Sequence, residues 1–256
     1  MTTKPQNKRY KSHKGLTLVE LLVVLVVLVA TGGLLVPTIN NALSRSHVAT
    51  CATSFPEVHQ MMQRVQIEAG QFGTDFDSGL DTADTTTPVN SVPFAGATLQ
   101  AVALTAAEAD ALAAVGITTV VDHDATAADY NVTFNIGSTQ RTLGDGEEVI
   151  TLTDAQADGV FLPSAGAEKY IWLGIGRDWS LLSTLAPEPP VHFGDTPGSL
   201  PDEVHSRFGI IMQVADEAGD ALEAAEFKRI SYCIDGDGFE TGDNHIEVYW
   251  QEIAQN

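Results

Sequence analysis

The longest hydrophobic stretch of the chain runs from Leu16 to Val36 and contains one charged residue, Glu20. As a helix, its twenty-one residues would span about 31 Å, close to the ~30 Å hydrocarbon core of a bilayer. A carboxylate placed in lipid costs at least about 2.5 kcal/mol, so Glu20 needs a partner or a function there. The pattern therefore predicts a membrane-spanning helix over 16–36 in which Glu20 has a functional role.

Beyond Val36 the helical pattern continues but becomes amphipathic. Pro37 lacks a backbone donor and crowds the carbonyl of Gly33, which predicts a softened turn, and Pro56 predicts a second one. Gly70 is a suitable end for the helix. We expect one helix from 16 to about 69, whose later half buries the residues that recur at helical spacing: Val58, Met61, Met62, Val65 and Ala69.

The remaining residues, 70–256, predict one exported α+β domain. Residues 70–98 are rich in Gly, Thr, Asp and Pro without periodicity, which predicts a long surface loop, and residues 186–201 carry five prolines and predict another. A capping box at Thr105 and Glu108 opens a helix that Gly116 ends. Strand patterns cover 117–121, 130–136, 149–152, 169–176, 208–214, 227–234 and 245–253. We expect an antiparallel sheet, clearest in the carboxy-terminal part, packed on the later half of the long helix.

Charge is distributed very unevenly along the chain. Residues 1–15 hold five of the thirteen Lys and Arg residues and no acid, so the positive-inside rule keeps this end cytoplasmic. After Gly15, eight basic residues stand against thirty-four acidic ones, a formal charge of −26. An acidic surface of this kind repels phosphate backbones, so we expect no nucleic-acid partner.

The basic leader, Gly15, the sequence Leu16-Thr17-Leu18-Val19-Glu20, the apolar helix and then Pro37 resemble the amino terminus of type IV pilins and type II secretion pseudopilins. The resemblance covers the first thirty to forty residues. It implies that a membrane-embedded prepilin peptidase cuts between Gly15 and Leu16 and that Leu16 is then N-methylated, although the family most often has Phe at this position. It also implies that Glu20 pairs with the free amine of a neighbouring subunit during assembly and that the helix loosens near Pro37.

The function implied by the resemblance is structural. The leader (1–15) is removed, the helix 16–36 anchors a single-pass protein in the bacterial inner membrane and later forms the filament core, 37–69 continues the helix, and 70–256 is extracytoplasmic. The implied partners are the prepilin peptidase, other pilin or pseudopilin subunits, the inner-membrane assembly platform and membrane lipid. Major pilin, secretion pseudopilin and minor subunit all remain open.

Other interpretations of the amino terminus also remain open. The helix could be an uncleaved signal anchor in which Glu20 is tolerated near the interface, or a secretory signal peptide cut near Ala30-Thr31-Gly32. In an alternative of a different functional class, the helix only anchors an extracytoplasmic binding or hydrolytic domain.

The sequence also offers a candidate calcium site and a candidate disulfide. Asp235, Asp237, Asp243 and Asn244 crowd oxygen ligands into a late loop, which suits a hard cation, and some major pseudopilins bind calcium in their late loops. In the alternative interpretation, the Asp-Gly and Gly-Asp steps simply make turns between strands. Cys51 and Cys233 lack metal-ligand spacing, so either they form a disulfide in an oxidising compartment or they are separate buried thiols.

Catalytic motifs are lacking in the sequence. It contains no G-x-S-x-G, H-E-x-x-H or phosphate-binding loop pattern, and no catalytic residue is predicted. One histidine, His123, stands between Asp122 and Asp124, where it could serve as a general base. On an acidic loop we expect it instead to be a solvated surface residue.

Overall fold

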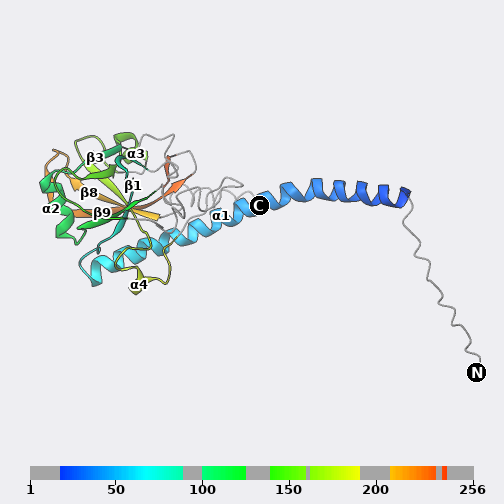
Figure 1. Cartoon of the computed structure of the whole chain (residues 1–256), viewed down its shortest axis with the longest axis horizontal. Coiled ribbons are helices and arrows are strands. Elements are labelled where there is room, and N and C mark those ends of the chain that lie inside the picture. Colours follow the sequence, from blue (N-terminus) through cyan, green and yellow to red (C-terminus); the bar gives the residue numbers. More distant parts are fainter. Residues whose placement is uncertain are drawn as a thin grey trace, which may run out of the picture. The chain divides into compact units, whose positions relative to one another are not determined.

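The computed structural model describes residues 18–88, 100–124, 139–159, 162–190, 208–234 and 238–240, without the side chains of 32, 34–53, 155, 159 and the residues from 231 onward. The chain divides into two compact units, Met1–Leu43 and Ser44–Asn256. The first unit contains the beginning of a long helix. The second contains the end of that helix and a mixed sheet with shorter helices (Figure 1).

Helix α1 extends from Leu18 to Glu68 and passes through both Pro37 and Pro56, so neither proline interrupts it. Gly70 follows the end of the helix, as predicted, and its backbone takes a φ of 67° that glycine adopts without strain. Within the second unit, α1 buries Val58, Met62 and Val65 against the sheet and partly buries Met61, while Ala69 is exposed. The predicted amphipathic half is therefore confirmed, except at its last position.

Ten strands within the described residues form one sheet. Their order is β10-β9-β8-β7-β1-β4-β5, β2 pairs with β1, and β3 joins β7 through β6. The strands are β1 Phe76–Asp81, β2 Asp84–Pro88, β3 Gln100–Ala103, β4 Thr119–His123, β5 Thr139–Thr142, β6 Glu148–Thr151, β7 Lys169–Gly174, β8 Phe208–Ala215, β9 Ala221–Ile234 and β10 Gly238–Glu240. Five of the predicted strands are thus confirmed with shifted ends (β4, β6, β7, β8 and β9), whereas 130–136 and 245–253 lie outside the described residues.

The sheet is mixed, which corrects the prediction of an antiparallel sheet. Strands β1 and β4 run parallel, with Phe76 opposite Val120 and Asp77 opposite Val121. Parallel neighbours need a crossover connection, and the segment between these two strands contains helix α2 (Ala106–Ala114). The sequence predicts α2 correctly but does not reveal that this helix lies in the connection between two parallel strands of one sheet.

The predicted surface loop over 70–98 is wrong for residues 76–88, which contain β1 and β2, while 89–98 lie outside the described residues. Residues 76–81, FDSGLD, form the central strand β1, and all of them except Asp81 are buried. Polar residues in the middle of β1 interrupt the apolar pattern by which a buried strand is recognised in a sequence. They can be buried because their side chains form hydrogen bonds with residues from distant parts of the chain. Composition alone therefore misassigned a strand that lies at the centre of the sheet.

The sheet has a core on each face. On one side, Ile171 and Leu173 of β7 pack with α1, α2 and neighbouring strands in the larger cluster. On the other side, Tyr170 and Trp172 of the same strand pack with Ala157 of helix α3 (Asp154–Gly159) in the smaller one. This alternation along β7 is expected of a strand covered on both faces. Figure 1 shows α1 and the short helix α4 (Leu182–Leu185) on the side of the sheet opposite α3.

The predicted capping box of α2 is confirmed in detail. Thr105 Oγ1 accepts a hydrogen bond from the Glu108 backbone N–H, and Glu108 Oε2 accepts one from the Thr105 backbone N–H. Gly116 follows the helix with a φ of 86°. Glu108 also binds Lys169 Nζ at 2.8 Å, so the cap ties α2 to the first residue of β7.

Candidate functional site

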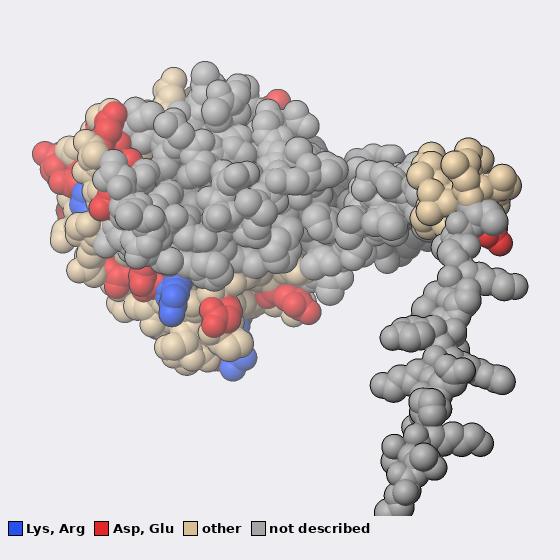
Figure 2. All heavy atoms as spheres, turned by 45° about the vertical axis from the view of Figure 1, so that its right-hand side comes forward, with Lys and Arg blue, Asp and Glu red and all other residues tan. Residues whose placement is uncertain are grey.

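The first described part of α1 carries an apolar surface on every side. From Leu18 to Val29, each residue except Glu20 is a Leu or Val, and these eleven side chains are 53–80% exposed. Figure 2 shows this end of the helix as an almost uncharged surface. A surface helix of a globular domain has one apolar stripe, whereas a helix that is apolar all round belongs in a membrane or a protein core. These residues are therefore a candidate assembly segment.

Glu20 is the only acid of this segment and lies in the first described turn of α1. The residues of the predicted cleavage site, Gly15 and Leu16, lie outside the described residues.

The other polar side chain described in this part of the helix is satisfied internally. Thr31 Oγ1 donates to the carbonyl oxygens of Val27, at 2.9 Å, and Leu28, at 3.1 Å. A hydroxyl bonded to its own helix can enter an apolar environment without leaving a buried polar group unpaired. Thr31 is thus compatible with lipid or with a neighbouring helix.

Across the described parts of the chain, no helix is both long enough and apolar enough to cross a membrane. The span predicted from the sequence, 16–36, includes two residues outside the described ones and several whose side chains are not described. The membrane-spanning helix therefore stays a prediction.

The structure leaves the remaining sequence-predicted site residues untested. Pro37 and Cys51 lie in α1, and Cys233 lies in β9 opposite Phe239, but the side chains of all three are undescribed. The four proposed calcium ligands, Asp235, Asp237, Asp243 and Asn244, lie outside the described residues. Among the residues that are described, no group of three or more His, Cys, Asp or Glu side chains is placed to hold a metal ion.

His123 is not a solvated surface residue, which corrects the prediction from the sequence. Its side chain is fully buried, as is that of Asp77, and His123 Nε2 lies 2.5 Å from Asp77 Oδ1. Asp122 is 3% exposed. Asp122 and His123 are the last two residues of strand β4 and lie inside the sheet, where each buried polar group requires a hydrogen-bond partner. Sequence reasoning missed the pair because its members are 46 positions apart.

Asp122 is the centre of a second set of contacts beside this pair. Arg141 binds both oxygens of Asp122, with Nε at 2.6 Å from Oδ2 and one terminal nitrogen at 2.9 Å from Oδ1, and its other terminal nitrogen lies 3.0 Å from Glu147. The hydroxyl of Ser78 donates to Asp122 Oδ1 at 2.6 Å. Burial alone lowers the pKa of Arg141, but the two carboxylates outweigh burial and raise this pKa above its ordinary value.

The two sets of contacts surround a bulge in β1. The pairing of β1 with β4 slips between Asp77 and Asp81, and Gly79 takes a φ of 68°. Asp77 Oδ1 and Ser78 Oγ accept hydrogen bonds from the backbone N–H groups two residues ahead, those of Gly79 and Leu80. These side chains therefore satisfy the backbone where the ladder is broken.

This buried cluster has the residue types of a hydrolase triad but a different arrangement. A serine nucleophile needs its hydroxyl beside an imidazole base in a cavity that a substrate can reach. Here the Ser78 hydroxyl donates to a carboxylate, and Ser78, Asp77 and His123 are at most 2% exposed. The geometry supports a structural role, holding the parallel pair β1–β4 together at its bulge.

The two features differ in what they offer to other molecules. The assembly segment presents apolar surface outward, whereas the polar cluster directs its donors and acceptors at one another. The candidate functional site is therefore the assembly segment, Leu18–Val29. Comparison of the chain with protein-family models, with curated proteins and with solved structures found no match.

Proposed function

We propose that this chain is a pilin-like subunit that is cut between Gly15 and Leu16 by a prepilin peptidase and assembled into a type IV pilus or a type II secretion pseudopilus. The leader motif supports the processing step. The observation that carries the proposal is the exposed apolar surface of α1 from Leu18 to Val29, which contains one acid. The proposal gives the chain no catalytic role.

The magnitude of the exposed surface argues that water is not its final environment. Burying one Leu or Val side chain stabilises by about 1.5–3 kcal/mol, and eleven such side chains lie exposed on this segment. A bilayer covers them before assembly, and the same helices of neighbouring subunits cover them afterwards. Because both environments are apolar, a subunit moves from one to the other at a modest cost.

Glu20 favours the move of the subunit from the bilayer into the filament. In lipid its carboxylate is unfavourable, and removal of the leader creates a positively charged amine at Leu16 of each subunit. Pairing of that amine with Glu20 of a neighbour neutralises both charges in the filament core. The contact joins two different surfaces, so it does not close into a dimer and propagates along the filament.

Mass spectrometry of the mature amino terminus tests the proposal. In cells that contain a prepilin peptidase, we expect the chain to begin at Leu16 and to carry one added methyl group. A Gly15→Leu variant serves as the matched control, since it should keep its leader under identical expression. An intact leader on the unsubstituted chain would contradict the proposal and favour a membrane-anchored binding or hydrolytic domain.

The kind of subunit is a separate question within the proposal. The domain is larger than expected for a compact major pilin, which favours a pseudopilin or a minor subunit, whereas Glu20 argues against a tip-most subunit because such subunits often lack the acid. Quantifying this chain in sheared filaments distinguishes them: a major subunit dominates the preparation, and a minor one is present at trace level.

A further inference from the structure

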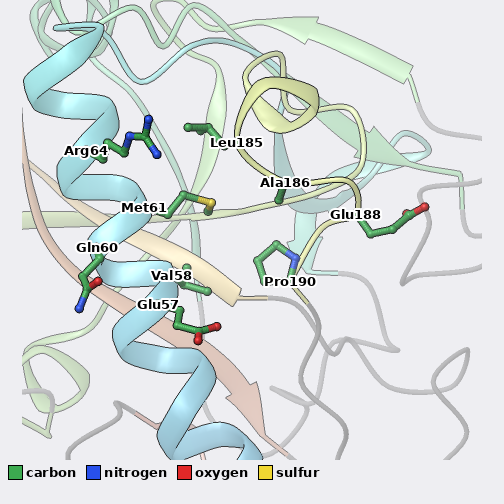
Figure 3. A pocket seen from close by; sticks show the side chains of 9 residues that line it. All are labelled: Glu57, Val58, Gln60, Met61, Arg64, Leu185, Ala186, Glu188 and Pro190. Atoms are coloured by element: carbon green, nitrogen blue, oxygen red, sulfur yellow. The ribbon is translucent and has the colours of Figure 1, made fainter.

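An open groove of about 390 Å³ lies between the later half of α1 and the segment that follows α4 (Figure 3). One wall comes from a single face of α1, where Val58 and Met61 contribute apolar surface. The other wall runs from Leu185 through Ala186 to Pro190. Val58 belongs to the larger core cluster, so the apolar floor of the groove is continuous with the packed interior of the second unit.

Two carboxylates and one cation lie among the described residues that line the groove. Glu57 lines one wall and Glu188 the other, and both are exposed. The residues at 187, 189 and 190 are prolines, which have a carbonyl oxygen but no N–H group. The cation among these described residues, Arg64, donates through Nε to Glu68 at 2.8 Å. The complementary ligand is consequently a donor-rich cation attached to an apolar group.

The walls of the groove are also preformed. One is a helix anchored to the core, and the other is a proline-rich segment whose φ angles are fixed by the pyrrolidine rings. Concave sites of this volume that combine apolar surface with a small number of polar groups are typical binding sites, and a rigid site loses little entropy when a ligand binds.

We propose that this groove binds a short segment of a partner protein in which Lys or Arg stands next to an apolar side chain. The apolar side chain covers Met61 and Ala186, and the cation lies between Glu57 and Glu188. The proposal does not depend on filament assembly, since the groove lies wholly within the unit Ser44–Asn256.

Selection from a random peptide display library tests the chemistry. The full chain, held in non-ionic detergent, should enrich peptides in which Lys or Arg adjoins Leu, Ile, Met or Phe. The selected peptides should bind the double variant Glu57→Gln/Glu188→Gln about tenfold more weakly, the size of a lost charge-assisted hydrogen bond. The control Asp110→Asn/Glu223→Gln changes the net charge equally at two exposed acids outside the groove and should bind as the unsubstituted chain does.

Photo-crosslinking tests the location. A benzophenone amino acid in place of Gln60, which lines the groove, should capture a selected peptide, whereas the same group in place of Gln66, exposed on the same helix outside the groove, should not. The proposal is overturned if no basic-apolar peptide is enriched, if the two double variants bind equally, or if both positions crosslink alike. It is also overturned if the group at Gln60 captures a second copy of the chain in place of the peptide.

Discussion

His123 Nε2 lies 2.5 Å from Asp77 Oδ1, with both side chains fully buried, and the contact joins the last residue of β4 to the middle of β1. Asp77 also accepts the Gly79 N–H at the bulge. Replacing Asp77 by Ala leaves a buried imidazole and a backbone donor without this acceptor. Leaving a buried polar group without its hydrogen-bond partner typically costs about 1–3 kcal/mol.

We therefore expect Asp77→Ala to lower the free energy of unfolding by about that amount, measured by urea titration of the full chain in non-ionic detergent. Asp77→Asn keeps an oxygen acceptor of the same shape and should cost less. Glu223→Gln, which removes an exposed carboxylate, is the control. Equal stability of Asp77→Ala and the control would show that the pair does not hold the sheet.

These contacts also show where prediction from sequence succeeds and where it stops. The cap of α2 is local: Thr105 and Glu108 are three positions apart, and the sequence predicts both hydrogen bonds correctly. The strands with continuous apolar patterns, such as β7 and β8, are also predicted correctly from the sequence. In each case the information needed lies within one element.

The sheet centre is different because its partners are distant in sequence. Asp77 and Ser78 suggest a loop when taken locally, and only contacts 46 and 44 positions away make them compatible with a buried strand. The parallel pairing of β1 with β4 depends on the same contacts. The candidate assembly segment, in contrast, can be predicted from the sequence, because its continuous run of Leu and Val is local and does not depend on contacts with distant residues.

Arg141 binds Asp122 through two nitrogens, a geometry that lysine cannot reproduce. We expect Arg141→Lys to lower the free energy of unfolding by about 1–3 kcal/mol, because one oxygen of a buried carboxylate loses its donor. The matched control is Lys228→Arg, at a more exposed pair with Glu226, and it should change stability by less than about 0.5 kcal/mol. Thermal unfolding of both variants would contradict the expectation if their midpoints shifted alike.

Asp75 and Glu108 link stability to pH. Burial alone raises the pKa of each, but hydrogen bonds outweigh burial and lower both below their ordinary values: those of Asp75 come from Thr119, Gln140 and Thr74, and those of Glu108 from Lys169 and Thr105. The unfolded chain therefore takes up protons at a higher pH than the folded chain. Their contribution to stability is complete above the unfolded pKa values, about 4, and is lost as the pH falls through the lower folded values.

We therefore expect the thermal unfolding midpoint of the unsubstituted chain to decrease as the pH falls below 4. In the double variant Asp75→Asn/Glu108→Gln this decrease should be smaller. The control Asp110→Asn/Glu223→Gln removes the same number of acids at exposed sites and should follow the unsubstituted chain. Parallel curves for all three proteins would show that these two carboxyl groups are not linked to folding.

Gly209 is required by the indole of Trp172. A Cβ added at Gly209 would lie 2.0 Å from Trp172 Nε1, and Trp172 is fully buried against the smaller core cluster. Gly209→Ala should therefore destabilise the domain by about 1–3 kcal/mol or more, as overpacking of a core does. Gly144→Ala is the matched control, because no atom lies within 4 Å of the added carbon and the backbone there is not left-handed. Equal melting temperatures for the two variants would contradict the packing described for β7 and β8.

Glu20 is the residue on which filament assembly depends in the proposed function. Glu20→Ala removes the carboxylate and leaves the eleven exposed Leu and Val side chains from Leu18 to Val29 unchanged, so membrane insertion and cleavage after Gly15 should proceed normally. Assembly should fall by tenfold or more, since a pairing contribution of about 1.4 kcal/mol corresponds to a factor of ten. Glu20→Asp keeps the charge and should retain part of the activity. The measurement is the amount of this chain in sheared filaments relative to the processed subunit in the membrane. If Glu20→Ala subunits are cut correctly and still assemble at the normal rate, the amine of Leu16 is not the partner of Glu20, and the apolar contacts alone drive polymerisation.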